Sequence, residues 1–295
     1  MIDQAIFRPV VPAAAKRPRL WHWREPSILP GFPLGLGITL LYLSLIVVIP
    51  LAALAIRPWE LGLSGFWRVL TDERVLRAFR LSFGLSILAA LLNAPLGLLI
   101  AWSLTRYQFP GRRILDALVD LPFALPTAVA GIALTTIYAP NGPIGALAAK
   151  FGIKTAYSPL GIFIALVFIG LPFVVRAVQP VLEDIDHEVE EAAQTLGATD
   201  FQRALFVILP AVGPALISGV SLAFARAVGE YGSVVFIAGN MPLKTEIAPL
   251  LIVIKLEQYD YAGAAAVGMA MVLISFGALV VINAAQILLA RRGRK

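Results

Sequence analysis

Long runs of apolar residues, separated by short polar segments, dominate this chain of 295 residues. A helix needs about 20 apolar residues to cross the hydrocarbon core of a bilayer. Six runs are long enough, and they lie near Leu34–Ile56, Leu81–Leu104, Leu118–Tyr138, Leu160–Val178, Val207–Val228 and Ala262–Leu289. The pattern therefore predicts an all-α integral membrane protein with six transmembrane helices.

The spacing of these runs also predicts how the chain is divided. Ala53-Leu54-Ala55 resembles the cleavage site of a signal peptide, but the apolar run before it is long enough to span, so we expect a retained helix. The expected parts are a cytoplasmic N-terminal tail (1–30), a first, peripheral transmembrane helix (31–57), a permease-like membrane core (77–290) and a basic C-terminal tail (291–295).

Composition narrows the class of function. Apolar residues make up 59% of the chain and charged residues only 14%, with a net charge of +6. Much of the positive charge flanks the first and last runs, where it suits membrane lipid headgroups better than nucleic acid, so we expect no nucleic-acid partner. The chain has no cysteine, and His22 and His187 are its only histidines, so we expect no metal site, no cofactor and no catalytic residue.

A polar segment between the fourth and fifth runs is the most informative part of the chain. Acidic residues between Asp184 and Glu191 suit the positive end of a helix dipole. Gly197 can adopt a positive φ and end that helix. Two small residues, Ala192 and Ala193, and two apolar ones, Leu196 and Phe201, flank the bend and offer a surface to a partner. The simpler alternative is a solvated acidic loop with a glycine turn.

The spacing within this segment is similar to a known motif. Glu191-Ala192-Ala193, Gly197 and Pro210 resemble the EAA loop of bacterial ABC importer permeases, the short cytoplasmic helix that docks into the ATPase subunit. The resemblance implies a type I ABC importer permease fold with a coupling helix between spans 4 and 5. It assigns ATPase coupling to Glu191, Ala192, Ala193, Leu196, Gly197, Phe201 and Pro210.

From about Arg77 onward the chain resembles the T-type permeases of bacterial sulfate/thiosulfate importers. The segments that carry this resemblance are Ala101-Trp102, Arg106–Arg113, Asp116–Gly131, Tyr138–Gly142, Leu171–Arg176, Gln179–Glu183, Phe224–Gly232, Phe236–Leu251 and Lys255–Gly263. It implies a multi-pass inner-membrane protein with cytoplasmic termini, which translocates sulfate or thiosulfate. The implied partners are two ABC ATPase subunits, a W-type sister permease and a periplasmic sulfate/thiosulfate-binding protein.

The chain itself is not expected to be an enzyme. It contains no Gly-rich ATP-binding loop with Lys and Ser/Thr, so ATP hydrolysis would belong to the partner ATPases. A molybdate/tungstate permease remains an alternative, because those oxyanions have the same charge and nearly the same shape as sulfate. An ion-gradient secondary transporter is a further alternative from a different class.

Charged residues inside the apolar runs are costly and therefore invite a functional explanation. Arg226 and Glu230, or the helix end at Pro126-Thr127, could form an anion pathway or gate. Alternatively, Arg226 and Glu230 pair as i,i+4 neighbours and brace a gate without touching the anion.

Other polar residues within or beside the runs have structural explanations. We expect Arg176 to extend to the lipid headgroups. Asp116 and Asp120 stand one helical turn apart, with Arg112 and Arg113 beside them as expected ion-pair partners. Asn93 and Gln286 are expected to form hydrogen bonds between helices.

Overall fold

The computed structural model describes residues 32–292, apart from the side chains of Pro33, His187, Ala285 and residues 287–292. Every regular element in these residues is a helix, which confirms the all-α prediction. The chain divides into two compact units, residues 1–51 and 52–295. The tail expected over residues 1–30, and residues 293–295 of the basic C-terminal tail, lie outside the described part.

The first unit contains one continuous apolar helix. It comprises α1 (Phe32–Leu43), the π-helical turn η1 (Ser44–Val48) and the start of α2 (Ile49–Ile56). Pro50 has no amide hydrogen, so one carbonyl in the preceding turn loses its helical partner, and a local π turn accommodates that loss. The described side chains of α1 are exposed, as lipid-facing side chains of a membrane helix would be.

The second unit holds the remaining helices. They are η2 (Arg57–Leu61), α3 (Gly62–Leu70), α4 (Glu73–Arg106), α5 (Arg112–Val119), α6 (Leu121–Ala124), α7 (Thr127–Tyr138), α8 (Pro143–Lys150), α9 (Pro159–Asp184), α10 (His187–Thr195), α11 (Asp200–Arg203), η3 (Ala204–Ile208), α12 (Leu209–Val228), α13 (Gly232–Ile237), α14 (Ala248–Glu257) and α15 (Tyr261–Arg292). The predicted second, fourth, fifth and sixth runs correspond to α4, α9, α12 and α15.

Five helical stretches among the described residues are long and apolar enough to cross a membrane. They are Leu34–Leu70, Glu73–Arg106, Pro159–Asp184, Asp200–Val228 and Tyr261–Ala284. The expectation of one helix over 118–138 is wrong, because the chain there forms α5, α6 and the 12-residue α7. Pro122 and Pro126 each remove an amide hydrogen from that stretch, and residue 125, which precedes Pro126, is extended. The six-span count therefore remains a prediction.

Small residues let α4, α9 and α12 pack closely. A Cβ on Gly97 of α4 would lie 2.6 Å from Val174 of α9, and one on Gly219 of α12 would lie 2.9 Å from the backbone of the same residue. The buried side chain of Asn93 donates a hydrogen bond of 3.2 Å to the Val167 carbonyl on α9. Gln286 donates one of 3.5 Å to Ser218 on α12. The expected hydrogen bonds between helices are thus confirmed.

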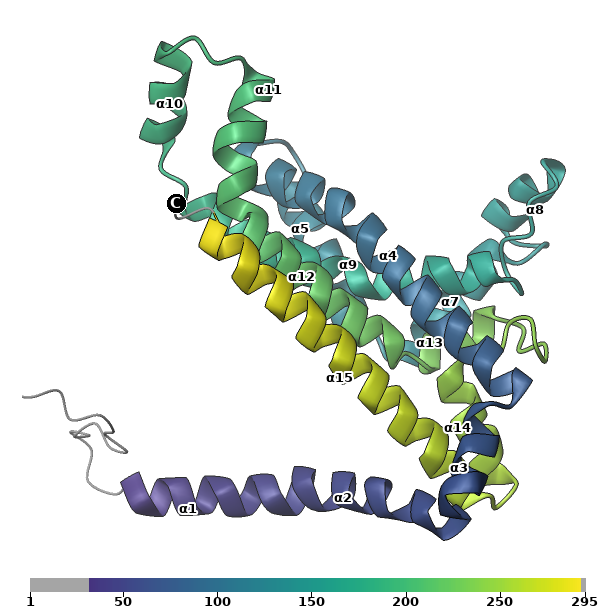
Figure 1. The fold of residues 1–295 in the computed structure, drawn as a ribbon. Helices are drawn as coiled ribbons and strands as arrows, with labels where there is room; N and C mark the ends of the chain where they lie inside the picture. The colour runs from purple at the N-terminus through teal and green to yellow at the C-terminus, as the bar shows by residue number, and fades with distance from the viewer. Residues whose placement is uncertain (1–31, 293–295) are drawn as a thin grey trace, which may run out of the picture. The chain divides into compact units, whose positions relative to one another are not determined.

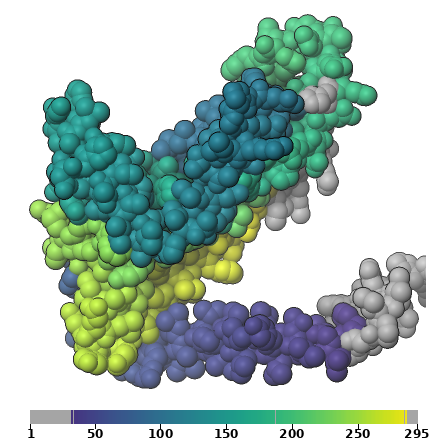
Figure 2. All heavy atoms as spheres, turned by 180° about the vertical axis from the view of Figure 1, so that it is seen from behind, coloured from purple at the N-terminus to yellow at the C-terminus, as the bar shows by residue number. Residues whose placement is uncertain are grey.

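Within this unit, α9, α12 and α4 run alongside one another, and α15 lies along α12 (Figure 1). The polar segment between α9 and α12 forms a helical hairpin, α10 and α11, which projects beyond the ends of those long helices (Figure 1). In the space-filling view the green lobe that contains this hairpin lies beside blue atoms and exposes much of its own surface (Figure 2). The segment predicted to dock a partner is therefore accessible in this chain.

Candidate functional site

Helix-capping residues and a glycine turn stabilise the α10–α11 hairpin, and all of them can be recognised in the sequence. Asp186 caps α10 by accepting a hydrogen bond of 3.0 Å from the amide of Glu188. At the other end, the amide of Gly197 donates to the Gln194 carbonyl at 2.9 Å and the amide of Ala198 to the Ala193 carbonyl at 3.1 Å. This pair of bonds is the Schellman motif, and it requires the φ of +85° that Gly197 adopts.

The N-cap of the second helix of the hairpin, Thr199, lies two residues after this glycine. Thr199 and Gln202 form a capping box, in which each side chain satisfies a backbone amide of the other residue. The chain then continues through η3 into α12, where Pro210 follows the π turn just as Pro50 follows η1. Pro210 thus shapes the junction between the hairpin and the long helix, at the place where the sequence motif ends.

The tip of the hairpin exposes apolar side chains. Leu196 is 88% exposed and Phe201 is 75% exposed, and both flank the turn at Gly197. Glu191 and Ala192 are also exposed, and Ala193 is half-buried. The structure thus brings the predicted coupling residues together on one projecting hairpin, apart from Pro210 at its base.

One contact ties this hairpin to a distant part of the chain. Arg106, the last residue of α4, forms an ion pair with Glu190 of α10, and the two side chains are only 11% and 15% exposed. The guanidinium carbon of Arg106 also lies 5.8 Å from the ring centroid of Trp102, one turn earlier on α4. The sequence pattern did not single out Arg106 or Glu190 as partners, because 84 residues separate them.

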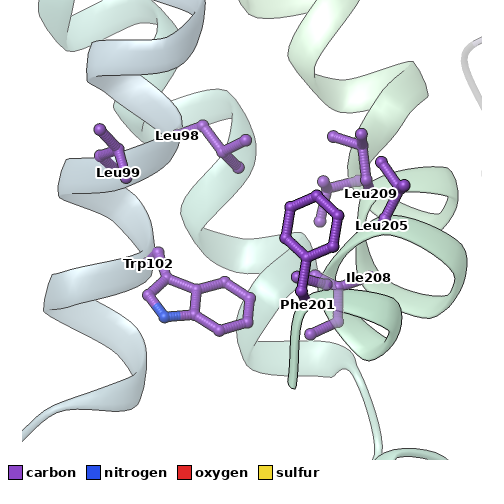
Figure 3. A pocket seen from close by; sticks show the side chains of 9 residues that line it. Leu98, Leu99, Trp102, Phe201, Leu205, Ile208 and Leu209 are labelled. Atoms are coloured by element: carbon purple, nitrogen blue, oxygen red, sulfur yellow. The ribbon is translucent and has the colours of Figure 1, made fainter. Parts of the chain in front are cut away.

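Beside this ion pair, an apolar cavity of about 330 Å³ lies between α4 and the start of α12. It is lined by Leu98, Leu99, Trp102, Phe201, Ala204, Leu205, Ile208, Leu209 and Val212. In the close view, Trp102 on α4 and Phe201 on α11 face the cavity from opposite sides (Figure 3). The hairpin is therefore joined to α4 by an ion pair, and the two elements line a common apolar cavity.

A second group of predicted residues meets where α7, α12 and α13 come together. Arg226 Nη1 lies 2.5 Å from Glu230 Oε2, so these residues form the expected i,i+4 pair. The other Glu230 oxygen accepts hydrogen bonds of 2.9 Å from both the amide and the hydroxyl of Ser233 at the start of α13. Thr127, the first residue of α7 after Pro126, lies so close that a Cβ on Gly232 would be 2.2 Å from its hydroxyl oxygen.

Arg176 differs from the expectation that its side chain extends to lipid headgroups. Its guanidinium binds Asp120 with bonds of 2.8 and 2.6 Å and Asp116 with a bond of 2.7 Å. The two carboxylates thus pair with an arginine 56 and 60 residues away rather than with the neighbouring Arg112 and Arg113. A charge on an apolar helix is costly, and the two carboxylates offset that cost within the protein.

Comparison with known folds defines the class of protein. The chain is similar to a solved bacterial ABC transporter involved in the import of the acidic polysaccharide alginate, with a TM-score of 0.73, 16% identity, and coverage of 87% of this chain and 95% of that one. It is also similar to a chain of the MetNI methionine ABC transporter, with a TM-score of 0.52, 19% identity, and coverage of 74% and 95%. The fold is that of an ABC importer permease.

Sequence comparison then gives the family. The binding-protein-dependent transport system inner membrane component family matches residues 93–295, and the chain belongs to this family. It is 47% identical over 265 residues to the sulfate transport system permease protein CysT of Escherichia coli (strain K12), covering 90% of this chain and 96% of that one. It is 49% identical over 249 residues to the Synechocystis CysT, covering 84% and 87%. The chain is thus a multi-pass inner-membrane transport subunit and not an enzyme.

Proposed function

We propose that this chain is the permease subunit through which sulfate, and by the same chemistry thiosulfate, crosses the inner membrane in an ATP-driven importer. The observation that carries the proposal is the 47% identity, over 90% of the chain, to a sulfate transport system permease. The alternatives are less well supported. The relatives compared above bear the name of sulfate rather than molybdate permeases, and the fold is that of ABC importers rather than of an ion-gradient transporter.

In this proposal the α10–α11 hairpin is the ATPase-docking element. Apolar side chains as exposed as Leu196 and Phe201, set in an otherwise acidic hairpin, favour a partner that covers them. Ala192 and Ala193 would allow the backbone of the partner to approach α10 closely. Because ATP lies in the cytoplasm, the hairpin faces the cytoplasm, and both chain termini lie on the same side if the membrane is crossed six times.

The proposed assembly contains two ATPase subunits, a W-type sister permease and a periplasmic sulfate/thiosulfate-binding protein, all embedded in or bordered by membrane lipid. The family description, with its dependence on a binding protein, supports the last of these partners. Within this chain, residues 77–290 form the permease core and residues 31–57 a first, peripheral span. The family match from residue 93 onward is consistent with that division.

The junction of α7, α12 and α13 is the proposed gate. Glu230 is buried, and it is bound at once to Arg226 and to the first turn of α13. A movement of α12 would therefore move the start of α13, which lies against Thr127 and the end of the Pro126 kink. In this arrangement the Arg226–Glu230 pair braces the gate, and the anion need not bind Arg226 tightly.

The function is tested by uptake of radiolabelled sulfate into cells that lack the gene, compared with cells that carry it on a plasmid. We expect uptake to be lost on deletion and restored by the plasmid, with excess thiosulfate a stronger competitor than molybdate. Loss of labelled molybdate uptake, with sulfate uptake unchanged in a strain that has no second sulfate importer, would contradict the proposal.

A further inference from the structure

The last turn of α4 carries two residues that meet the hairpin. Trp102 and Arg106 are four residues apart and therefore lie on one face of α4. Arg106 reaches Glu190 on the first helix of the hairpin, and Trp102 faces Phe201 on the second across the apolar cavity (Figure 3). The first helix of the hairpin is thus ion-paired to this end of α4, and the second lines a cavity with it.

The Arg106–Glu190 pair differs from an ion pair within the hairpin itself. Arg203 pairs with Asp200, but these residues are three apart in one helix, and the Asp200 side chain is 94% exposed. A local pair whose carboxylate is so exposed contributes little to stability, and it joins no distant elements. Arg106 and Glu190 are 11% and 15% exposed and join two elements that are distant in sequence, so removing either partner leaves a poorly solvated charge.

α4 is also the element best placed to pass a displacement on. It packs along α9 and α12, where Gly97 lies against Val174 without room for a Cβ. At its opposite end, Arg74 binds the buried carboxylate of Glu246 through two hydrogen bonds of 2.7 and 2.5 Å, and so holds the loop that precedes α14. A carboxylate from a distant segment of the chain is therefore bound at each end of this helix: Glu190 of α10 at one end and Glu246 of a loop at the other.

We propose that the Arg106–Glu190 pair is the contact that transmits displacement of the hairpin to α4, and that Arg106 is a positioning residue for transport. The proposal rests on the docking role given to the α10–α11 hairpin above. When an ATPase moves α10, the ion pair displaces α4 in the same direction. Because α4 packs closely against α9 and α12, these helices are displaced as well. The cavity between Trp102 and Phe201 lets the two surfaces adjust while the pair holds.

The test uses the complete importer, purified with its ATPases and partner permease and reconstituted with its binding protein. The variants are Arg106→Gln, Glu190→Gln and the charge swap Arg106→Glu with Glu190→Arg. A matched control is Arg77→Gln, which removes a pair of 2.6 Å with Glu73 at the exposed opposite end of the same helix. ATPase co-purification reports docking, and the number of sulfate ions imported per ATP hydrolysed reports coupling.

Each single variant should keep its ATPases but import about tenfold less sulfate per ATP, within the usual range of coupling between sites. The charge swap should recover most of that loss, and Arg77→Gln should match the unaltered importer. Normal coupling in both single variants would overturn the proposal. Failure of all three variants to insert or to retain ATPases would overturn it too, because the pair would then serve only folding or docking.

A separate variant tests whether the hairpin is the docking element at all. Leu196→Asp places a charge at the exposed tip of the hairpin. If that variant retains its ATPases and its sulfate uptake, the hairpin is not the docking element, whatever the Arg106 variants do. If it loses its ATPases while Arg106→Gln keeps them and stays coupled, the docking assignment stands and the transmission proposal fails.

Discussion

Replacing Gly197 tests the geometry of the docking hairpin with little interference from packing. Its φ is +85°, a conformation that L-residues reach only with strain. No heavy atom lies within 4 Å of a Cβ added there, so a small side chain would meet no steric clash. The cost of Gly197→Ala is therefore backbone strain alone, about 1–2 kcal/mol for a left-handed residue.

That strain would shift the hairpin away from the Schellman turn that orients α10 against α11. A cost of 1–2 kcal/mol lowers the equilibrium constant for the docking conformation roughly 5- to 30-fold, so the Kd for the ATPase should rise by up to that factor. Gly197→Asn should cost less, because asparagine tolerates the left-handed region better than alanine. The assay is titration of labelled ATPase onto the permease in lipid nanodiscs, together with sulfate uptake.

The matched control is Gly213→Ala in α12, where a Cβ also meets no atom within 4 Å but φ is not positive. Alanine is the better helix former, so this variant should bind the ATPase normally. If Gly197→Ala and Gly197→Asn weaken binding equally, or if Gly213→Ala weakens it as much, strain at the turn is not the cause. Unchanged binding in every variant would refute the docking role of the hairpin.

Three further predictions concern the membrane core and the loops. Gly131→Val should destabilise the permease by about 1–3 kcal/mol, because a Cβ there would lie 2.5 Å from a carbonyl of α13, and thermal unfolding in detergent measures the loss. Arg226→Gln should reduce sulfate uptake, whereas Arg226→Gln with Glu230→Gln should recover it if the pair only braces the gate. A hydrogen bond from Lys255 lowers the pKa of Asp260, so Asp260→Asn should lower the thermal stability at pH 7.

Each of these has an outcome that contradicts it. The control for Gly131→Val is Gly84→Ala in α4, where the added Cβ has open space around it. This variant should unfold at the same temperature as the unaltered permease. Uptake that stays low in the Arg226 and Glu230 double variant would mean that the arginine itself serves the anion. The pKa of Asp260 is lower in the folded protein than in the unfolded chain, where it is about 4. The ionised carboxylate therefore stabilises the folded protein fully above about pH 4, and this stabilisation is lost as the pH falls through the pKa of the folded state. A stability difference that grows with acidification would contradict this.

The long helices could be predicted from the sequence, because an apolar run of membrane length has few stable structures other than a transmembrane helix. α4, α9 and α15 contain their predicted runs, and η3 and α12 together contain the run Val207–Val228. The turn at Gly197 was predictable for a similar reason, since a glycine after a short polar helix is a local signal. The break within 118–138 could have been anticipated from its two prolines, but prolines are common in membrane helices and do not always break them.

The contacts between distant residues could not be predicted in the same way. Asp116 and Asp120 have arginines beside them in the sequence, yet the structure pairs them with Arg176. Nothing local distinguishes Arg106 from other arginines that end an apolar run, and its partner Glu190 is one of several acidic residues in α10. Short helices such as α8, α13 and α14 lack a long periodic pattern, so tertiary packing decides them.

The central claim is that this chain carries sulfate in an ATP-driven importer, and transport in a defined membrane tests it most directly. The chain would be reconstituted with its sister permease and ATPases in proteoliposomes, with ATP inside and sulfate-loaded binding protein outside. We predict accumulation of labelled sulfate that requires ATP, the binding protein and this chain. Accumulation driven by an ion gradient without ATP, or accumulation that persists when this chain is omitted, would contradict the account.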